Sequence, residues 1–299
     1  MRKLMIGAAV LAILVVGAVG WLFYANGSPQ GRFPLDLAAI RAAAAQAGPG
    51  PTRIEVETVS HQAVPEIAMV AGGRWGKIDM IRTSYRLVWP DGVSGIIDTT
   101  YDRATAKDAD RFDEAALARV RRGMAGARWI VVTHEHSDHL GGLKTDPAWR
   151  TTLPHALLTP EQLASPVGTL PPWPAGARAV IRPFAYDRIK AIAPGVVLIK
   201  APGHTPGSQM IYVRRADGRE YIFMGDVAST LANVTTGHIR SHLVTDWMTH
   251  DDRPAVLRQV TALKIAQVAS PGLVLVPGHD GAAIAALARN GDLATGFRF

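Results

Sequence analysis

The sequence of 299 residues contains no cysteine. This absence excludes disulfide bonds, a thiolate nucleophile, cysteine metal ligands and lipid-modified cysteine. Any metal ion would therefore have to be held by nitrogen and oxygen atoms. The sequence also lacks a G-x-S-x-G motif, an internal repeat and a low-complexity tract. Its hydrophobic and charged fractions, 48% and 19%, are those of a globular chain rather than of a disordered or fibrous one.

A concentrated basic segment is also missing. The net charge of +7 could suit nucleic acid or an anionic membrane surface. However, the arginines are scattered, and no basic run is interleaved with aromatic residues. We therefore expect a solvated basic surface, and we do not expect a nucleic-acid partner.

One long apolar run begins the chain. Two basic residues, at positions 2 and 3, precede apolar or small residues over 4–25. A helix here would cross the roughly 30 Å hydrocarbon layer. We expect residues 1–26 to be an uncleaved single-pass membrane anchor, with everything after Ala25 on the extracytoplasmic, periplasmic side. The alternative is a cleaved signal peptide, which would leave a secreted or periplasmic protein, because residues 25–27 loosely fit a cleavage site.

Residues 27–52 are predicted to form a linker followed by a short alanine-rich helix. The helix, LDLAAIRAAAAQAG, is capped at Asp36 and stopped by Gly48 and Pro49. A packing or spacer role is the expected one for this helix.

The remaining residues, 53–299, are predicted to be one α+β domain. Its helices are expected over 108–124 and 251–270. The predicted strands include 53–59, 128–133, 195–200 and 272–277, with turns at 90–92 and 216–218 joining two further pairs. These mixed periods fit two sheets sandwiched between helices, which is a four-layer αββα arrangement.

Three histidines and an aspartate are crowded just after the predicted strand 128–133. His134, His136, Asp138 and His139 form the pattern H-x-H-x-D-H. Alternation along the chain lets the first two histidines point toward one ion, while Asp138 and His139 round the turn toward a second.

Three later strand ends supply further donors: His204 in PGHTPGS, Asp226 in MGD and His279 in PGHD. Taken singly, each is more often a loop residue or a helix cap, but all four pieces in order favour a metal site. Seven ligands fill two sites if Asp226 bridges. The first ion would be held by His134, His136 and His204, and the second by Asp138, His139 and His279.

These motifs resemble the metallo-β-lactamase superfamily of metallohydrolases. The segments THEHSDHLGG, PGHTPGS, MGDVA and PGHD match its successive motifs, and the resemblance covers residues 53–299. It implies the αββα fold with metals between the two sheets. GIIDTT also resembles the family's first motif, which implies that Asp98 orients ligand histidines. An ordinary turn residue at the end of a strand is the alternative for Asp98.

The resemblance implies a dinuclear metal-dependent hydrolase with a small-molecule substrate. Two divalent ions, zinc or else manganese, iron or cobalt, would share a hydroxide that attacks an ester or lactone carbonyl. Asp138 and Asp226 are the expected catalytic carboxylates. The alternatives are phosphodiester or phosphonate hydrolysis, β-lactamase-type activity, and a metal-binding module without turnover.

Differences between this sequence and individual branches of the family narrow the range of expected reactions and substrates. Redox di-iron members have glutamate where this chain has His136, and true β-lactamases lack an aspartate at the place of Asp226. Glyoxalase II relatives carry a helical extension, whereas only residues 280–299 follow the last motif here. The membrane anchor weighs against transfer-RNA processing. Many acyl-homoserine lactonases have a tyrosine three positions after the bridging aspartate, and this chain has Ser229 there.

Several other residues have two interpretations. The segment after Asp226 is either a wall of the substrate pocket or an ordinary surface connection, and Trp173 lies either on a rim loop or in a packing turn. Tyr212, within a predicted strand, is expected to be a packing residue. The histidines and tryptophan of the segment after Asp226 are His238, His242, Trp247 and His250, and His61 and His155 have no supporting spacing.

Overall fold

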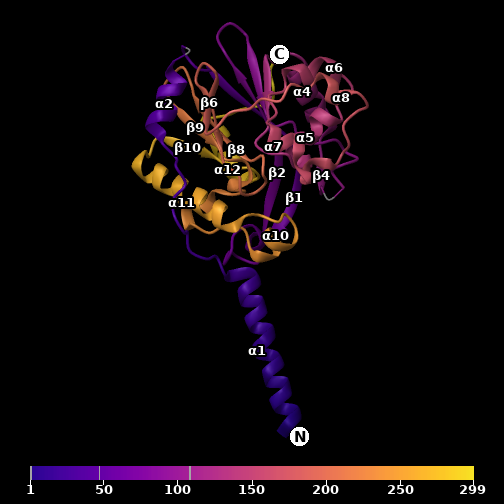
Figure 1. The fold of residues 1–299 in the computed structure, drawn as a ribbon, viewed down its shortest axis with the longest axis vertical. Helices are drawn as coiled ribbons and strands as arrows, with labels where there is room; N and C mark the ends of the chain where they lie inside the picture. The colour runs from indigo at the N-terminus through magenta and orange to yellow at the C-terminus, as the bar shows by residue number, and fades with distance from the viewer. Residues whose placement is uncertain (1, 47, 108) are drawn as a thin grey trace.

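Two β-sheets face each other, and helices cover the outer face of each sheet (Figure 1). The computed structural model describes residues 2–46, 48–107 and 109–299, and in these ranges the strands form one six-stranded and one five-stranded sheet.

The first sheet has the strand order β11-β1-β2-β3-β5, and β4 pairs with β1 beside this path. The long β1 and β2 pair antiparallel over their whole length, with a register shift between Thr58 and Ser60, and β3 pairs parallel with β5. The strands are β1 Arg53–Pro65, β2 Lys77–Val88, β3 Ser94–Ile97, β4 Arg111–Phe112, β5 Trp129–Val131 and β11 Ala294–Thr295.

The second sheet has the order β10-β9-β8-β7-β6. Its first four strands in the chain form an antiparallel meander, and β10 joins β9 in parallel. The strands are β6 Ile189–Ala193, β7 Val196–Lys200, β8 Gln209–Arg214, β9 Glu220–Phe223 and β10 Leu273–Val276. The expected hairpin turn over 216–218 is present, with Gly218 at a φ of 85°.

The helices fall into longer layer helices and short connecting turns. The longer ones are α1 Arg2–Tyr24, α2 Leu37–Ala45, α4 Glu114–Ala125, α5 Ser137–Lys144, α11 Arg253–Ala269 and α12 Gly281–Arg289. The shorter ones are α3 Glu66–Met69, α6 Trp149–Thr152, α7 Pro160–Ala164, α8 Ala177–Val180, α9 Leu231–Thr236 and α10 His242–Trp247, with single 3-10 turns at η1 Leu153–His155, η2 Pro166–Thr169 and η3 Gly225–Val227.

Hydrophobic side chains form a separate core in each gap between layers. Leu87 of β2 and Phe223 of β9 meet in the core between the sheets. Ile40 of α2 and Leu263 of α11 pack on the outer face of the second sheet, and Leu117 of α4 packs on the first. Burial of these side chains supplies the main driving force for the arrangement. The expected mixed α+β fold with two sheets is confirmed.

One predicted helix begins too early. Residues 108–124 were expected to be helical, but Arg111 and Phe112 form β4, whose partners are on β1. Helix α4 begins only after Asp113, whose side chain accepts a hydrogen bond from Ala116 N. Pairing with a strand distant in sequence therefore overrides the local helical pattern. Asp108 of this prediction lies outside the described residues.

The alanine-rich helix is present as α2. Asp36 caps it, as predicted, by accepting a hydrogen bond from Ala39 N at 3.0 Å. The helix ends at Ala45, before the glycine and proline expected to stop it, and Ala47 lies outside the described residues.

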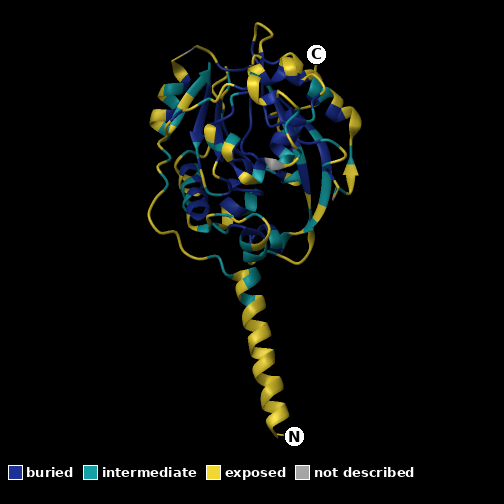
Figure 2. Ribbon diagram, turned by 45° about the vertical axis from the view of Figure 1, so that its right-hand side comes forward, coloured by how far each residue is buried: buried dark blue, intermediate teal, exposed yellow. Residues whose placement is uncertain are grey.

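Helix α1 stands out from the domain, and none of its residues is buried (Figure 2). Its mean hydropathy of 2.5 and its length of 23 residues suffice for a membrane span, and a signal sequence has the same properties. Met1 of the predicted anchor lies outside the described residues.

Candidate metal centre

The four residues of the H-x-H-x-D-H pattern lie where β5 runs into α5. His134 lies two residues beyond the residue that follows the end of the buried strand β5 at Val131. His136 occupies the N-cap position of α5, so that Asp138 and His139 lie on its first turn. The helix can start here because Gly142 packs against the loop after β3. A Cβ atom at Gly142 would lie 2.0 Å from Thr99 O, which leaves no room for a side chain.

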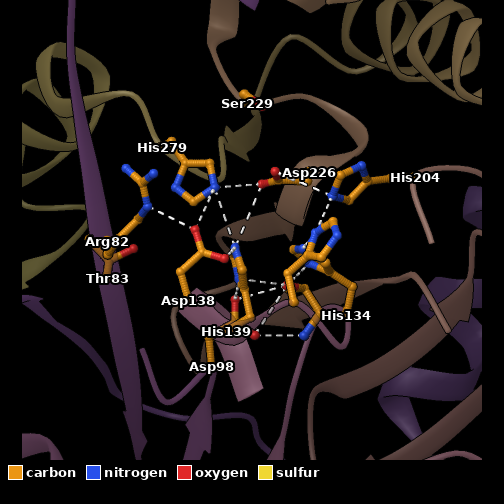
Figure 3. Close-up of polar contacts among 12 residues, drawn as sticks. Arg82, Thr83, Asp98, His134, Asp138, His139, His204, Asp226, Ser229 and His279 are labelled. Atoms are coloured by element: carbon orange, nitrogen blue, oxygen red, sulfur yellow. Dashed lines mark hydrogen bonds and ion pairs between the residues drawn. The ribbon is translucent and has the colours of Figure 1, made fainter. Parts of the chain in front are cut away.

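The later residues arrive from three other strand ends of the second sheet. His204 lies in the loop between β7 and β8, Asp226 on the 3-10 turn after β9, and His279 just after β10. All of the predicted ligands come together, and their donor atoms converge between the two sheets (Figure 3).

Three imidazole nitrogens form the first group. His134 Nε2 lies 3.0 Å from His136 Nδ1, which in turn lies 2.9 Å from His204 Nε2. Three nitrogens at these separations could each lie about 2.0–2.1 Å from one ion, which is the usual zinc–nitrogen distance.

The second group joins two histidines and a carboxylate. His139 Nε2 lies 3.3 Å from His279 Nε2, and Asp138 Oδ2 lies 3.6 Å from His279 Nε2. Asp226 lies between the groups: its Oδ1 is 2.8 Å from His279 Nε2, and its Oδ2 is 3.5 Å from His204 Nε2. One carboxylate therefore faces both groups.

The other ring nitrogens of three histidines are fixed by hydrogen-bond acceptors. His139 Nδ1 lies 2.9 Å from Asp98 Oδ2, His204 Nδ1 lies 3.0 Å from Asp251 Oδ1, and His279 Nδ1 lies 2.9 Å from Ile81 O. Because each Nδ1–H donates to its acceptor, each Nε2 presents a lone pair to the centre. Asp98 thus holds a ring of the centre in the orientation expected from the sequence.

Asp98 is itself fixed by the chain. It accepts hydrogen bonds from the backbone N–H of Thr133 at 2.6 Å and from the Thr133 hydroxyl. Its backbone lies in the left-handed region, with a φ of 59°, and so does that of Thr100, at 55°. Residues other than glycine rarely adopt this conformation, and such strain is concentrated at functional sites.

The donor set fits divalent metal ions. Unprotonated nitrogens that face one another at about 3 Å repel unless a cation lies between them, as expected for metal-bound imidazoles. Asp226 Oδ1 is buried and has no hydrogen-bond partner among the described residues. Imidazole nitrogens and carboxylate oxygens are ligands that zinc, manganese, iron and cobalt accept.

Burial and charge set the protonation states of two of the candidate histidines and of the carboxylate between the groups. Burial, together with neighbouring histidines, lowers the pKa of His134 well below its usual value, and it lowers the pKa of His136 to about 3. Burial alone would raise the pKa of Asp226, but His279 and Arg240 hold that pKa well below its usual value. The two histidines are therefore neutral and the carboxylate is ionised.

Two residues that the sequence did not single out complete the centre. Arg240 is buried, and its guanidinium donates to Asp226 Oδ2 at 2.8 Å and to Asp251 Oδ2 at 2.8 Å. Asp251 also accepts from His204, whereas its neighbour Asp252 caps α11. Neither residue belongs to a recognisable motif, so their roles depend on contacts that only the folded chain makes.

Arg82 of β2 is a third such residue. Its Nε donates to Asp138 Oδ2 at 2.8 Å, and its side chain borders a cavity of about 610 Å³ that opens beside the centre. We call this space the site cavity; its base is formed by Arg82, His136, Asp138, Asp226 and His279. Ser229, in contrast, is buried and accepts a hydrogen bond from Arg240 at 3.1 Å.

The other polar candidates lie away from the centre. Trp173 packs beside the core under α4, and Tyr212 is buried under α2 and α11 with its hydroxyl donating to Glu220, as expected of a packing residue. The segment after Asp226 does contribute to the site cavity, through Arg240, Leu243, Val244, Met248 and Thr249. His61, His155, His238, His242, Trp247 and His250 are not among the described residues that border the cavity.

The sequence model of the metallo-beta-lactamase superfamily matches residues 81–279, which is well over half of the chain. The chain therefore belongs to this superfamily and is a metal-dependent hydrolase. No curated protein shows significant sequence similarity to it.

Solved structures with the same fold include several lactonases. An N-acyl homoserine lactone hydrolase with N-hexanoyl-L-homoserine bound has a TM-score of 0.62 and 14% identity, over 79% of this chain and 96% of that chain. AidC, a dizinc quorum-quenching lactonase, has a TM-score of 0.52 and 15% identity, over 76% and 86%. A probable metal-dependent hydrolase from Staphylococcus aureus has a TM-score of 0.57 and 16% identity, over 77% and 90%. Identities this low establish the fold alone.

Proposed function

We propose that the protein is a dinuclear metallohydrolase that cleaves an ester or lactone carbonyl. The observation that supports two ions is the placement of Asp226, whose two oxygens face different groups of histidines. A site for one ion would not need a carboxylate in this position. The proposed ligands are His134, His136 and His204 for the first ion and Asp138, His139 and His279 for the second, with Asp226 shared.

Two divalent ions, zinc by preference, would lower the pKa of water toward neutrality and polarise the attacked carbonyl oxygen. The chain provides the rest. Asp98 and Asp251 fix the rings of His139 and His204, and Arg240 fixes the shared carboxylate. This preorganisation means that little reorganisation is required at the moment of reaction.

Asp138 is the carboxylate that we assign to proton transfer. It borders the site cavity, and Arg82 holds its Oδ2 at 2.8 Å. In the reaction a water oxygen bonds to the carbonyl carbon, the bond from that carbon to the alcohol oxygen breaks, and Asp138 passes the proton of the water to the leaving alcohol. The products are a carboxylic acid and an alcohol, which remain joined when the substrate is a lactone.

Two features support a carbonyl substrate. Lactonases share the fold, although at low identity. The second is the site cavity, whose mainly apolar walls suit a neutral carbonyl substrate. The phenol that many such lactonases have is replaced here by Ser229, whose hydroxyl accepts a hydrogen bond from Arg240. We also propose that α1 anchors the protein in a membrane, with the domain on the extracytoplasmic side.

A chromogenic panel of esters, lactones, phosphodiesters and β-lactams, combined with elemental analysis, tests this function. We expect about two ions per chain and turnover of an ester or lactone. His204→Ala should lose an ion and at least about a hundredfold in kcat/KM, since even residues that only orient ligands are worth 10–100-fold. The matched control is His155→Ala, which changes an exposed histidine. This variant should retain two ions and the full kcat/KM.

The other outcomes separate the alternatives. Turnover of phosphodiesters alone would indicate that the same centre catalyses phosphodiester hydrolysis. A fully metallated protein that turns over nothing in the panel would support a metal-binding module, and full activity of His204→Ala would contradict the mechanism.

A further inference from the structure

The end of α1 is attached to the domain next to α10 (Figure 1). The ring of Trp21 stacks on that of His242 of α10, with centroids 4.2 Å apart. Phe23 contacts Trp75 with centroids 5.0 Å apart, and Trp75 Nε1 donates to the hydroxyl of Tyr24 at 3.2 Å. The last turn of the helix is therefore packed against side chains of the domain.

Backbone hydrogen bonds fix the same junction. Gly72 N donates to Phe23 O at 2.9 Å. The side chain of Asn26 accepts from Ile239 N at 2.9 Å and donates to Gly237 O at 3.0 Å. Because contacts come from two separate loops of the domain, they set the direction in which α1 leaves it.

The site cavity extends from the metal centre to this junction. Asp138, Asp226 and His279 form its base, whereas Phe23 of α1 and Trp75 lie on its border. The walls between are mainly apolar, and they include Val64, Ile67, Met69, Leu243, Val244 and Met248. Its volume of about 610 Å³ is within the usual range for small-molecule sites. A polar base with mainly apolar walls suits a molecule with one reactive polar group and an apolar tail.

The end of the site cavity beside Phe23 and Trp75 is called the opening below. Large apolar side chains are exposed around it. Trp75 is 58% exposed, Met248 68% and Trp247, beside it, 70%. On α1 itself, Trp21 and Tyr24 are each 49% exposed. Tryptophan and tyrosine concentrate at the interface between lipid and water, and clusters of exposed apolar residues mark contact surfaces. With α1 across a bilayer, these residues would lie at its surface.

The charges near the base disfavour an anionic head group. Arg82 is paired with Asp138, and Arg240 is paired with Asp226 and Asp251. The guanidinium groups are thus already neutralised by carboxylates. A substrate whose polar part is an uncharged ester or lactone meets the site without a need for a free cation.

We propose that the natural substrate is a membrane-resident, uncharged ester or lactone with a long acyl chain, which enters the site cavity directly from the bilayer. This inference rests on the proposed function and on α1 as a retained anchor. The apolar tail lies along the wall between Trp75 and Met248, and the carbonyl reaches the metal centre. The tail passes from one apolar environment to another, so it does not need to cross water.

The full-length protein in phosphatidylcholine vesicles tests the proposal with two chromogenic esters. p-Nitrophenyl hexadecanoate partitions into the bilayer, whereas p-nitrophenyl butanoate remains in water. When inert phosphatidylcholine is added at a constant total amount of ester, the rate with the long ester should fall in proportion to its surface dilution. The rate with the short ester should not change.

The outcomes distinguish a failure of this inference from a failure of the proposed function. Hydrolysis of the long ester at a rate independent of surface dilution, or hydrolysis of the short ester alone, would overturn the inference and leave the proposed function intact. If the protein hydrolyses neither ester and none of the lactones of the panel, the proposed function is overturned, and the inference falls with it.

Variants at the opening provide a second test. Trp75→Ala should raise the KM for the long ester about tenfold, since the apolar tail would lose its contact with a large aromatic side chain. Val268→Ala, which removes a 76% exposed apolar side chain from α11, should not change it. Equal KM values in the two variants would contradict a tail that lies against Trp75.

A measurement that does not require turnover addresses the opening itself. Phosphatidylcholine with brominated acyl chains quenches tryptophan that contacts lipid. The fraction of fluorescence quenched should be larger in the wild-type protein than in Trp75→Phe. No difference would place the opening away from the bilayer and would overturn the proposal.

Discussion

At the scale of single residues, Arg240 joins the two halves of the centre. Its guanidinium bonds Asp226, which faces both metal groups, and Asp251, which holds His204. The side chain is 4% exposed, and that of Asp251 is fully buried. The Arg240 guanidinium and His204 hold the pKa of Asp251 below its usual value, although burial alone would raise it. An arginine suits this place because its planar fork can bond two carboxylates at once.

We expect Arg240→Met to weaken metal binding by about 10–100-fold, because the orienting contacts of Asp226 and His204 would be lost. The free energy of unfolding should fall by about 3–5 kcal/mol, since two buried carboxylates would lose the cation that is paired with both. Chelator titration and denaturant unfolding measure the two effects. Arg289→Met, at the exposed end of α12, should change neither value. Unchanged metal affinity in Arg240→Met would show that the guanidinium does not orient the centre.

At the scale of elements, the close approach of α5 to the loop after β3 positions both Asp98 and His139. Gly142 N donates to Thr100 O at 2.7 Å, and the Thr99 hydroxyl donates to His139 O. These contacts require the absence of a side chain at Gly142. The second glycine of HSDHLGG, Gly142, is therefore a packing requirement of the metal centre.

Gly142→Ala should displace this loop or the helix, because the new methyl group would overlap backbone atoms of Thr99. We expect a loss of roughly 1–3 kcal/mol in stability together with weaker metal retention. Gly76→Ala is the matched control, since a Cβ atom there would have no neighbour within 4 Å. Thermal unfolding and metal content report the difference, and equal behaviour of the two variants would contradict the argument.

The sequence indicated the candidate ligands that converge in the fold better than it indicated the residues that orient them. His134, His136, Asp138 and His139 form a local pattern that can be recognised without the fold. Arg240 and Asp251 act only because the connection after η3 folds back over His204, and no spacing in the sequence indicates that contact. The start of α4 was predicted too early for the same reason: β4 forms because it pairs with β1, which is distant in the sequence.

At the scale of the whole molecule, the absence of cysteine makes the orientation of the chain measurable. A single introduced cysteine would be the only thiol in the protein. Lys3 lies before the apolar run, and Val268 lies on the exposed surface of α11 in the domain. The proposed topology places these two positions on opposite sides of the membrane.

In intact cells, a membrane-impermeant maleimide should label Val268→Cys, while Lys3→Cys should react only after permeabilisation. The asymmetry follows from the retention of basic residues in the cytoplasm. Labelling is read by the mass added to the purified chain. Removal of the first segment as a signal peptide would also eliminate the Lys3→Cys site, so a product that starts near residue 26 would contradict the anchor.

The contact of Phe23 with Trp75 on the border of the site cavity has a consequence for modularity. Phe23, a side chain of α1, lies on the border of the site cavity itself. Exchanging α1 for a foreign helix would therefore change which substrates are admitted, and selection on substrate range would act on the anchor as well as on the domain.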